Sequence, residues 1–61
     1  MINLTKLNEE KFILNSDLIE VIEERPDTTI QLISGEYFLV TESAEEIVNK
    51  IITYKRKLYK R

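Results

Sequence analysis

The 61-residue sequence contains no cysteine and no histidine, and it has one glycine and one proline. Without cysteine or histidine it cannot form disulfides, use thiol or imidazole catalysis, or build the ordinary zinc and haem ligand sets. No run of about 18 apolar residues is present, and the N-terminal segment lacks the charged start and apolar stretch of a secretory signal. We therefore expect a cytoplasmic protein that does not span the membrane.

Hydrophobic residues are nevertheless plentiful, at 43% of a chain that is also 33% charged. This mixture is typical of a folded, soluble protein. A chain of this length buries only about 60% of the surface that its unfolded form exposes, so its core is marginal. Because low-complexity tracts, repeats and linker-like segments are absent, we expect one domain over residues 1–61.

The net charge of −2 hides a division of sign along the chain. Residues 1–46 contain all eleven acidic residues and three basic ones, whereas residues 47–61 contain six basic residues and no acidic one. Such asymmetry suggests an anionic partner for the C-terminal end, whether membrane, nucleic acid or protein.

Five short runs rich in β-branched, aromatic and other apolar residues predict strands at 2–5, 11–15, 18–24, 28–33 and 36–41. Turn-forming residues separate them, and Ser34 with Gly35 is the best hairpin signal because glycine adopts a positive φ without steric cost. None of the connections is long enough for a parallel crossover. The strands are therefore predicted to be antiparallel.

A helix is predicted over residues 43–58, after the last strand. Ser43 and Glu46 have the spacing of a capping box, and glutamates at this end with bases at the other match the helix dipole. One apolar stripe recurs at spacings of three and four, with Ile52 and Tyr59 on its flank: Ala44, Ile47, Val48, Ile51, Tyr54 and Leu58. The predicted class is α+β, an antiparallel sheet of four to five short strands followed by one C-terminal helix.

Side-chain alternation leaves apolar residues on both faces of the predicted sheet, whereas one helix covers one face. Either the sheet curls so that its own turns cover the second face, or another copy packs there. Because small domains commonly need oligomerisation for stability, we favour a homo-oligomer. The candidate self-association residues are Ile13, Leu18, Ile22, Ile33, Tyr37 and Leu39.

The carboxylates do not form a recognisable catalytic or metal-binding pattern. Calcium loops, glycine-rich phosphate loops and nucleophile elbows are absent from the sequence, and no histidine is available to activate a serine. Glu23 and Glu24 beside Arg25 are typical of charges that protect a sheet edge. We expect no enzymatic activity, no cofactor and no metal.

The segment 55–61 concentrates positive charge and has four possible interpretations. In the first, the bases complement the helix dipole and aid solubility. In the other three, they bind an anionic membrane surface, a nucleic acid, or the acidic sheet of another copy. The candidate partner-binding residues are Lys55, Arg56, Lys57, Lys60 and Arg61.

The chain as a whole resembles a family of small bacterial flagellar proteins called FlbD or SwrD. The matching stretches are INLTKLN at 2–8, FILNSDLIEVIE at 12–23, PDTTIQLISGEYFLV at 26–40 and ESAEEIVNKIITYKRK at 42–57. The resemblance rests on the order and spacing of three motifs. They are the Asn-x-Asp-Leu-Ile block, the Pro-Asp-Thr opening of the next hairpin and the Glu-Ser start of the helix. The family often has glycine after the first Leu-Asn, where this chain has Glu9.

This resemblance implies a cytoplasmic role in motility and swarming, where members support the power of the flagellar motor through its stator units. It assigns no enzymatic activity, cofactor or functional residue. We expect an accessory protein that binds a motor or stator component at the cytoplasmic membrane face and that self-assembles. Weak peripheral membrane contact is a further option. The alternative is a nucleic-acid-binding regulator of flagellar genes, which the sequence favours less because its strands lack exposed aromatic and basic pairs for stacking bases.

Overall fold

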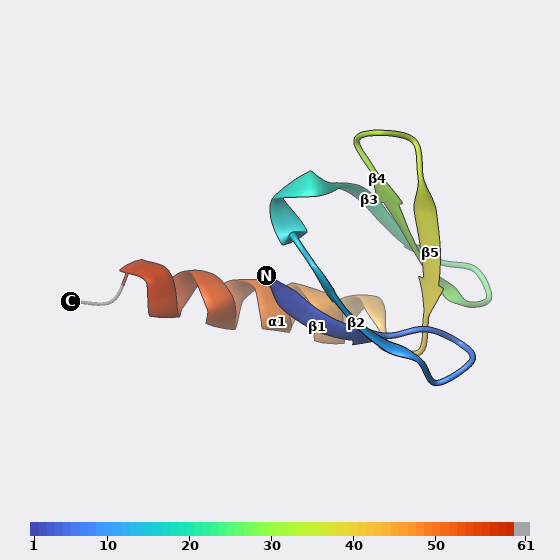
Figure 1. Ribbon diagram of the computed structural model, residues 1–61, viewed down its shortest axis with the longest axis horizontal. Coiled ribbons are helices and arrows are strands. Elements are labelled where there is room, and N and C mark those ends of the chain that lie inside the picture. Colours follow the sequence, from blue (N-terminus) through green and yellow to red (C-terminus); the bar gives the residue numbers. More distant parts are fainter. Residues whose placement is uncertain (60–61) are drawn as a thin grey trace.

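The computed structural model describes residues 1–59, which form five strands and one α-helix (Figure 1). The α+β class and the antiparallel pairing are confirmed. A short 3-10 turn at Ser16–Leu18 separates the second and third strands. The elements in chain order are β1 (Ile2–Thr5), β2 (Lys11–Leu14), β3 (Ile19–Glu24), β4 (Thr28–Leu32), β5 (Tyr37–Val40) and α1 (Ala44–Tyr59).

The strands form two sheets, so the prediction of a single sheet is wrong. One sheet pairs β1 with β2, and the other has the order β3-β4-β5. The chain changes direction after β2 because the Asn15 side chain accepts a hydrogen bond of 3.1 Å from the Asp17 N–H at the 3-10 turn. An isolated bridge between Lys6 and Val40 connects the two sheets.

Local turn and cap chemistry sets the element boundaries, and every predicted boundary lies within one residue of the observed one. Gly35 has a φ of 96°, as the hairpin between β4 and β5 requires. At the start of α1, the Ser43 N–H donates to Glu46 Oε1 over 2.9 Å, and the Glu46 N–H donates to Ser43 Oγ over 3.1 Å. The predicted capping box is therefore confirmed.

Both sheets and the helix share one apolar core. Its buried residues are Ile2, Leu4, Leu14, Ile30, Leu32, Val40 and Ile47. The rings of Phe12 on β2 and Phe38 on β5 lie 5.2 Å apart between centroids, so they also join the two sheets. The helix contributes Ile47, which is fully buried, and thus α1 closes the core.

A bulge in β3 changes which side chains face this core. Ile19 pairs with Leu32, but the next pair joins Val21 to Gln31, so the register shifts between Ile19 and Val21. Because an extra residue reverses the alternation, Ile19 and Ile22 both pack against the core, while Val21 is exposed. The prediction that Ile22 lies on the outer face is therefore wrong.

The turn between β1 and β2 contains a strained residue. Glu9 has a φ of 75°, in the left-handed region, and its N–H donates to the Lys6 carbonyl over 2.9 Å. A residue with a Cβ atom adopts this conformation at a cost, whereas glycine does not. This is the position where the flagellar family that the sequence resembles often has glycine.

We expect Glu9→Gly to stabilise the protein by about 0.5–1 kcal/mol, because relief of the strain exceeds the greater unfolded-state entropy of glycine. Urea unfolding followed by circular dichroism measures the change. Glu9→Ala is the matched control, since it removes the carboxylate but keeps the Cβ atom. If alanine stabilised the protein as much as glycine, side-chain repulsion rather than backbone strain would be the cause.

Candidate partner-binding surfaces

The helix α1 is packed along its first half and extends past the sheets along its second half (Figure 1). Ile47 is buried, and Ile51 and Tyr54 are partly buried against the core. Val48 and Leu58 are exposed, so only part of the predicted stripe faces the core. Leu58 stays exposed because the sheets end before the helix does, which also gives the molecule its elongated dimensions of 38 × 23 × 18 Å.

The projecting part of α1 carries apolar and basic side chains on one surface. We call Ile52, Lys55, Arg56 and Tyr59 the helix-end surface; with Ile51 they line a shallow hollow of about 370 Å³. Ile52 is 42% exposed and Tyr59 is 77% exposed. A surface that combines exposed apolar area with positive charge is suited to bind a partner that is apolar and acidic.

The candidate basic residues do not all share this surface. Lys55 Nζ lies 3.7 Å from Asp17 Oδ1, so an exposed ion pair joins the second half of the helix to the 3-10 turn. Lys57 lines a different hollow, between α1 and β1. Lys60 and Arg61 lie outside the described residues.

Four of the six candidate self-association residues belong to one surface, the outer face of the three-stranded sheet. Tyr37 and Leu39 lie on its outward side in β5, and the Ile33 N–H donates to the Leu18 carbonyl over 2.8 Å at its end. The exposed bulge residue Val21 completes what we call the outer sheet patch: Leu18, Val21, Ile33, Tyr37 and Leu39. Ile33 and Tyr37 are the most exposed of the five, at 65% each.

The other two candidates lie elsewhere. Ile13 is 68% exposed but belongs to β2, in the separate two-stranded sheet. Ile22 packs toward the core, as described above. Sequence alternation missed Val21 because it assumed a regular strand, and only the position of the bulge reverses that assignment.

Two carboxylates hold the start of α1 against the strands. Glu42 Oε1 accepts a hydrogen bond of 2.9 Å from the Thr5 N–H of β1. Glu24 Oε1 accepts one of 3.0 Å from the Ala44 N–H, so this residue caps the helix in addition to its predicted role at a sheet edge. These contacts fix where the helix begins and thus where its free end projects.

The pKa of the Glu42 carboxyl lies below its ordinary value of 4.5. Partial burial acts to raise this pKa, but the hydrogen bonds from Thr5 and the positive charge of Lys50 outweigh burial and lower it. Glu42 is therefore ionised at neutral pH in the folded protein.

The described residues contain no cluster of carboxylates that could hold a metal ion. Over residues 1–59, no helix has both the length and the apolar character to cross a membrane.

A comparison with protein-family models matches residues 1–59 to the family of flagellar and swarming motility proteins, FlbD. The chain belongs to the FlbD family. Comparisons with curated proteins and with solved structures gave no match. FlbD membership links this chain to flagellar and swarming motility. The two surfaces described above expose apolar side chains of this FlbD protein.

We expect Glu42→Gln to destabilise this FlbD protein by about 1 kcal/mol at neutral pH, because the Thr5 N–H loses a charged acceptor. A depressed folded-state pKa contributes stability above the unfolded-state value, and this contribution is lost as the pH falls through the folded-state value. The stability difference between the two proteins should therefore disappear as the pH falls below 4.5.

Chemical unfolding at a series of pH values measures this difference. Glu23→Gln on the exposed sheet face is the matched control and should stay within about 0.5 kcal/mol of the parent at neutral pH. A Glu42→Gln difference that persisted unchanged into acid would show that packing, not charge, is responsible.

Proposed function

We propose that this protein is a non-enzymatic accessory factor of flagellar motility and swarming. It acts by binding a motor or stator component at the cytoplasmic face of the cell membrane, and it assembles with other copies of itself. The observation that carries the proposal is the second half of α1, which extends past the sheets (Figure 1). It exposes apolar and basic side chains. The link to motility comes from the FlbD family.

The helix-end surface supports binding rather than intramolecular packing. Ile52 and Tyr59 are exposed next to Lys55 and Arg56, and no described strand covers the hollow that they line. Basic residues close to an anionic membrane surface each contribute about 1 kcal/mol of attraction. Positive charge here would hold the protein near the membrane while the apolar side chains contact a membrane-associated motor protein.

The outer sheet patch supports self-assembly. Its five apolar side chains surround the polar Gln31 and Thr29 on the face of the sheet opposite the core. Val21, Gln31, Gly35 and Tyr37 also line a hollow of about 380 Å³ on this face, which a side chain of a second copy can enter. Burial of such a patch offsets the small core of a short chain.

Replacement of the five C-terminal bases by glutamine should lower swimming torque toward that of a strain lacking the protein. The variant carries changes at Lys55, Arg56, Lys57, Lys60 and Arg61. Loss of about 1 kcal/mol for each of the five bases would weaken attachment to an anionic surface by more than about a thousandfold. Tethered-cell rotation under load measures torque, and pull-down of the tagged protein from motile cells identifies the motor component that is lost.

The matched control replaces Lys11 and Arg25, which are exposed bases of the strand region, by glutamine. Its torque should equal that of the parent. Unchanged torque in the five-residue variant, with normal folding, would contradict the proposed role of the C-terminal bases. Salt-sensitive binding of DNA with no motor protein recovered would favour the regulator of flagellar genes instead.

The parent protein should sediment as a species larger than the monomer at tens of micromolar. Tyr37→Thr with Leu39→Thr should shift it toward the monomer, because both changes remove apolar area from the outer sheet patch but keep a β-forming residue. Ile13→Thr is the matched control, since Ile13 is about as exposed as Tyr37 but belongs to the other sheet. A monomeric parent at this concentration would contradict self-assembly.

A further inference from the structure

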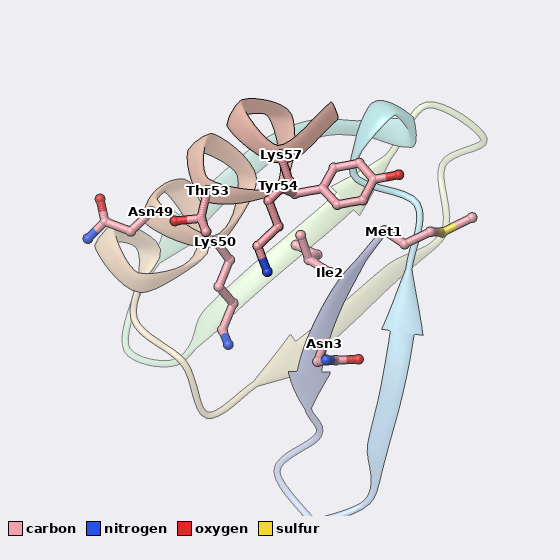
Figure 2. A pocket seen from close by; sticks show the side chains of 8 residues that line it. All are labelled: Met1, Ile2, Asn3, Asn49, Lys50, Thr53, Tyr54 and Lys57. Carbon is pink, nitrogen blue, oxygen red and sulfur yellow. The ribbon is translucent and has the colours of Figure 1, made fainter. Parts of the chain in front are cut away.

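A groove runs between β1 and α1, on a side of the helix distinct from the helix-end surface. It has a volume of about 380 Å³, and the ammonium groups of Lys50 and Lys57 extend from the helix toward β1 (Figure 2). Its lining residues include no carboxylate: Met1, Ile2, Asn3, Asn49, Lys50, Thr53, Tyr54 and Lys57. The groove is therefore positively charged.

The second feature of this groove is an open strand edge. On the side of β1 away from β2, the Thr5 N–H donates to Glu42 and the Thr5 carbonyl accepts from the Thr41 N–H over 2.8 Å. Because alternate residues of an antiparallel strand direct their backbone groups to the same side, Asn3 directs its N–H and its carbonyl to that side too. Asn3 lines the groove together with the two lysines, and the sheet order over residues 1–59 gives β1 no strand partner except β2.

The two lysines are available to an incoming acidic group. The two ion pairs within residues 1–59 use Lys6 and Lys55, not Lys50 or Lys57. Glu42 lies close enough to Lys50 for its pKa to be lowered, but Glu42 Oε1 is held by the Thr5 N–H and is not part of the groove lining. Lys50 and Lys57 lie seven residues apart on α1, which is about 10.5 Å along its axis.

We propose that this groove binds an extended acidic segment of a partner protein, which pairs with the β1 edge at Asn3 and places carboxylates against Lys50 and Lys57. A free anion would use only the donors, whereas a peptide backbone uses both the N–H and the carbonyl of Asn3. Glutamates at alternate positions of a strand are about 6.8 Å apart, so three of them span the distance between the two lysines. This inference rests on the proposed function, which supplies the partner protein. It deepens that function by naming the chemistry of the partner segment.

A defined peptide tests the proposal on the full-length protein. The probe is acetyl-Thr-Glu-Val-Glu-Val-Glu-Thr-amide, and its matched control has glutamine in place of each glutamate. Titration followed by amide NMR spectra should shift the Asn3 N–H signal and slow its hydrogen exchange. Lys50→Gln with Lys57→Gln should weaken binding about three- to tenfold, and the glutamine peptide should bind the parent with a similar loss.

The control protein carries Lys55→Gln and Arg56→Gln, which remove the same charge from the helix-end surface. It should bind the acidic peptide within about twofold of the parent. A peptide with a methylated backbone nitrogen at its centre should bind more weakly, because strand pairing is blocked. Amide spectra of each variant check that it remains folded.

Several results would overturn the proposal. One is an equal loss of peptide affinity in the control protein, which would mean that only the net charge of the protein matters. Another is an Asn3 N–H signal that does not shift when the peptide is added. Displacement of the peptide by inorganic phosphate at matched ionic strength would make the groove a simple anion site. The last is a parent protein that forms dimers in the absence of peptide, when the Lys50→Gln with Lys57→Gln protein does not. The groove would then bind a second copy.

The peptide titration and a torque assay of the Lys55→Gln and Arg56→Gln protein fail independently, because that protein keeps both groove lysines. Absence of peptide binding, with torque still dependent on Lys55 and Arg56, would remove the groove as a partner site and leave the proposed function standing. Peptide binding with no effect of the protein on motility would remove the proposed function.

Discussion

The backbone of Thr5 is the constraint on which the rest of the structure depends. A two-stranded sheet is only marginally stable alone, and β1 with β2 is such a sheet. Thr5 bonds to Thr41 over 2.8 Å and to Glu42 over 2.9 Å, which brings the first hairpin against the end of β5. Only in this arrangement do Leu4 and Val40 enter one core, to which α1 adds Ile47.

Sequence reasoning predicted the elements well and their assembly less well, for a physical reason. Element boundaries depend on local chemistry, such as the Ser43 and Glu46 capping box or the positive φ of Gly35, and residues close in sequence reveal it. Division into two sheets depends instead on contacts of Thr5 with residues far along the chain. No periodicity encodes such a contact, and the β3 bulge likewise arises from pairing with β4.

The candidate site could be predicted as a list of residues but not as surfaces. Composition identified the C-terminal bases, yet only the structure separates Lys57, which faces β1, from Lys55, which bonds to Asp17. Lys50 had no distinguishing sequence signal, because it is a single base on an amphipathic helix. Its proposed role depends on the neighbouring Asn3, which the tertiary position of β1 brings to the same groove.

The hydrophobic residues that the core does not bury lie on surfaces that differ in charge. The charge of each surface limits which partner that surface can bind. Within residues 1–59, seven hydrophobic residues are buried and twelve large ones are exposed, so the surplus is too large for a single patch. The outer sheet patch borders Glu23 and lies in the acidic part of the chain, whereas the helix-end surface contains Lys55 and Arg56. A partner attracted by the bases of the helix-end surface is therefore not attracted by the charge of the outer sheet patch. The proposed self-assembly through the outer sheet patch and the proposed motor binding through the helix-end surface therefore use different residues.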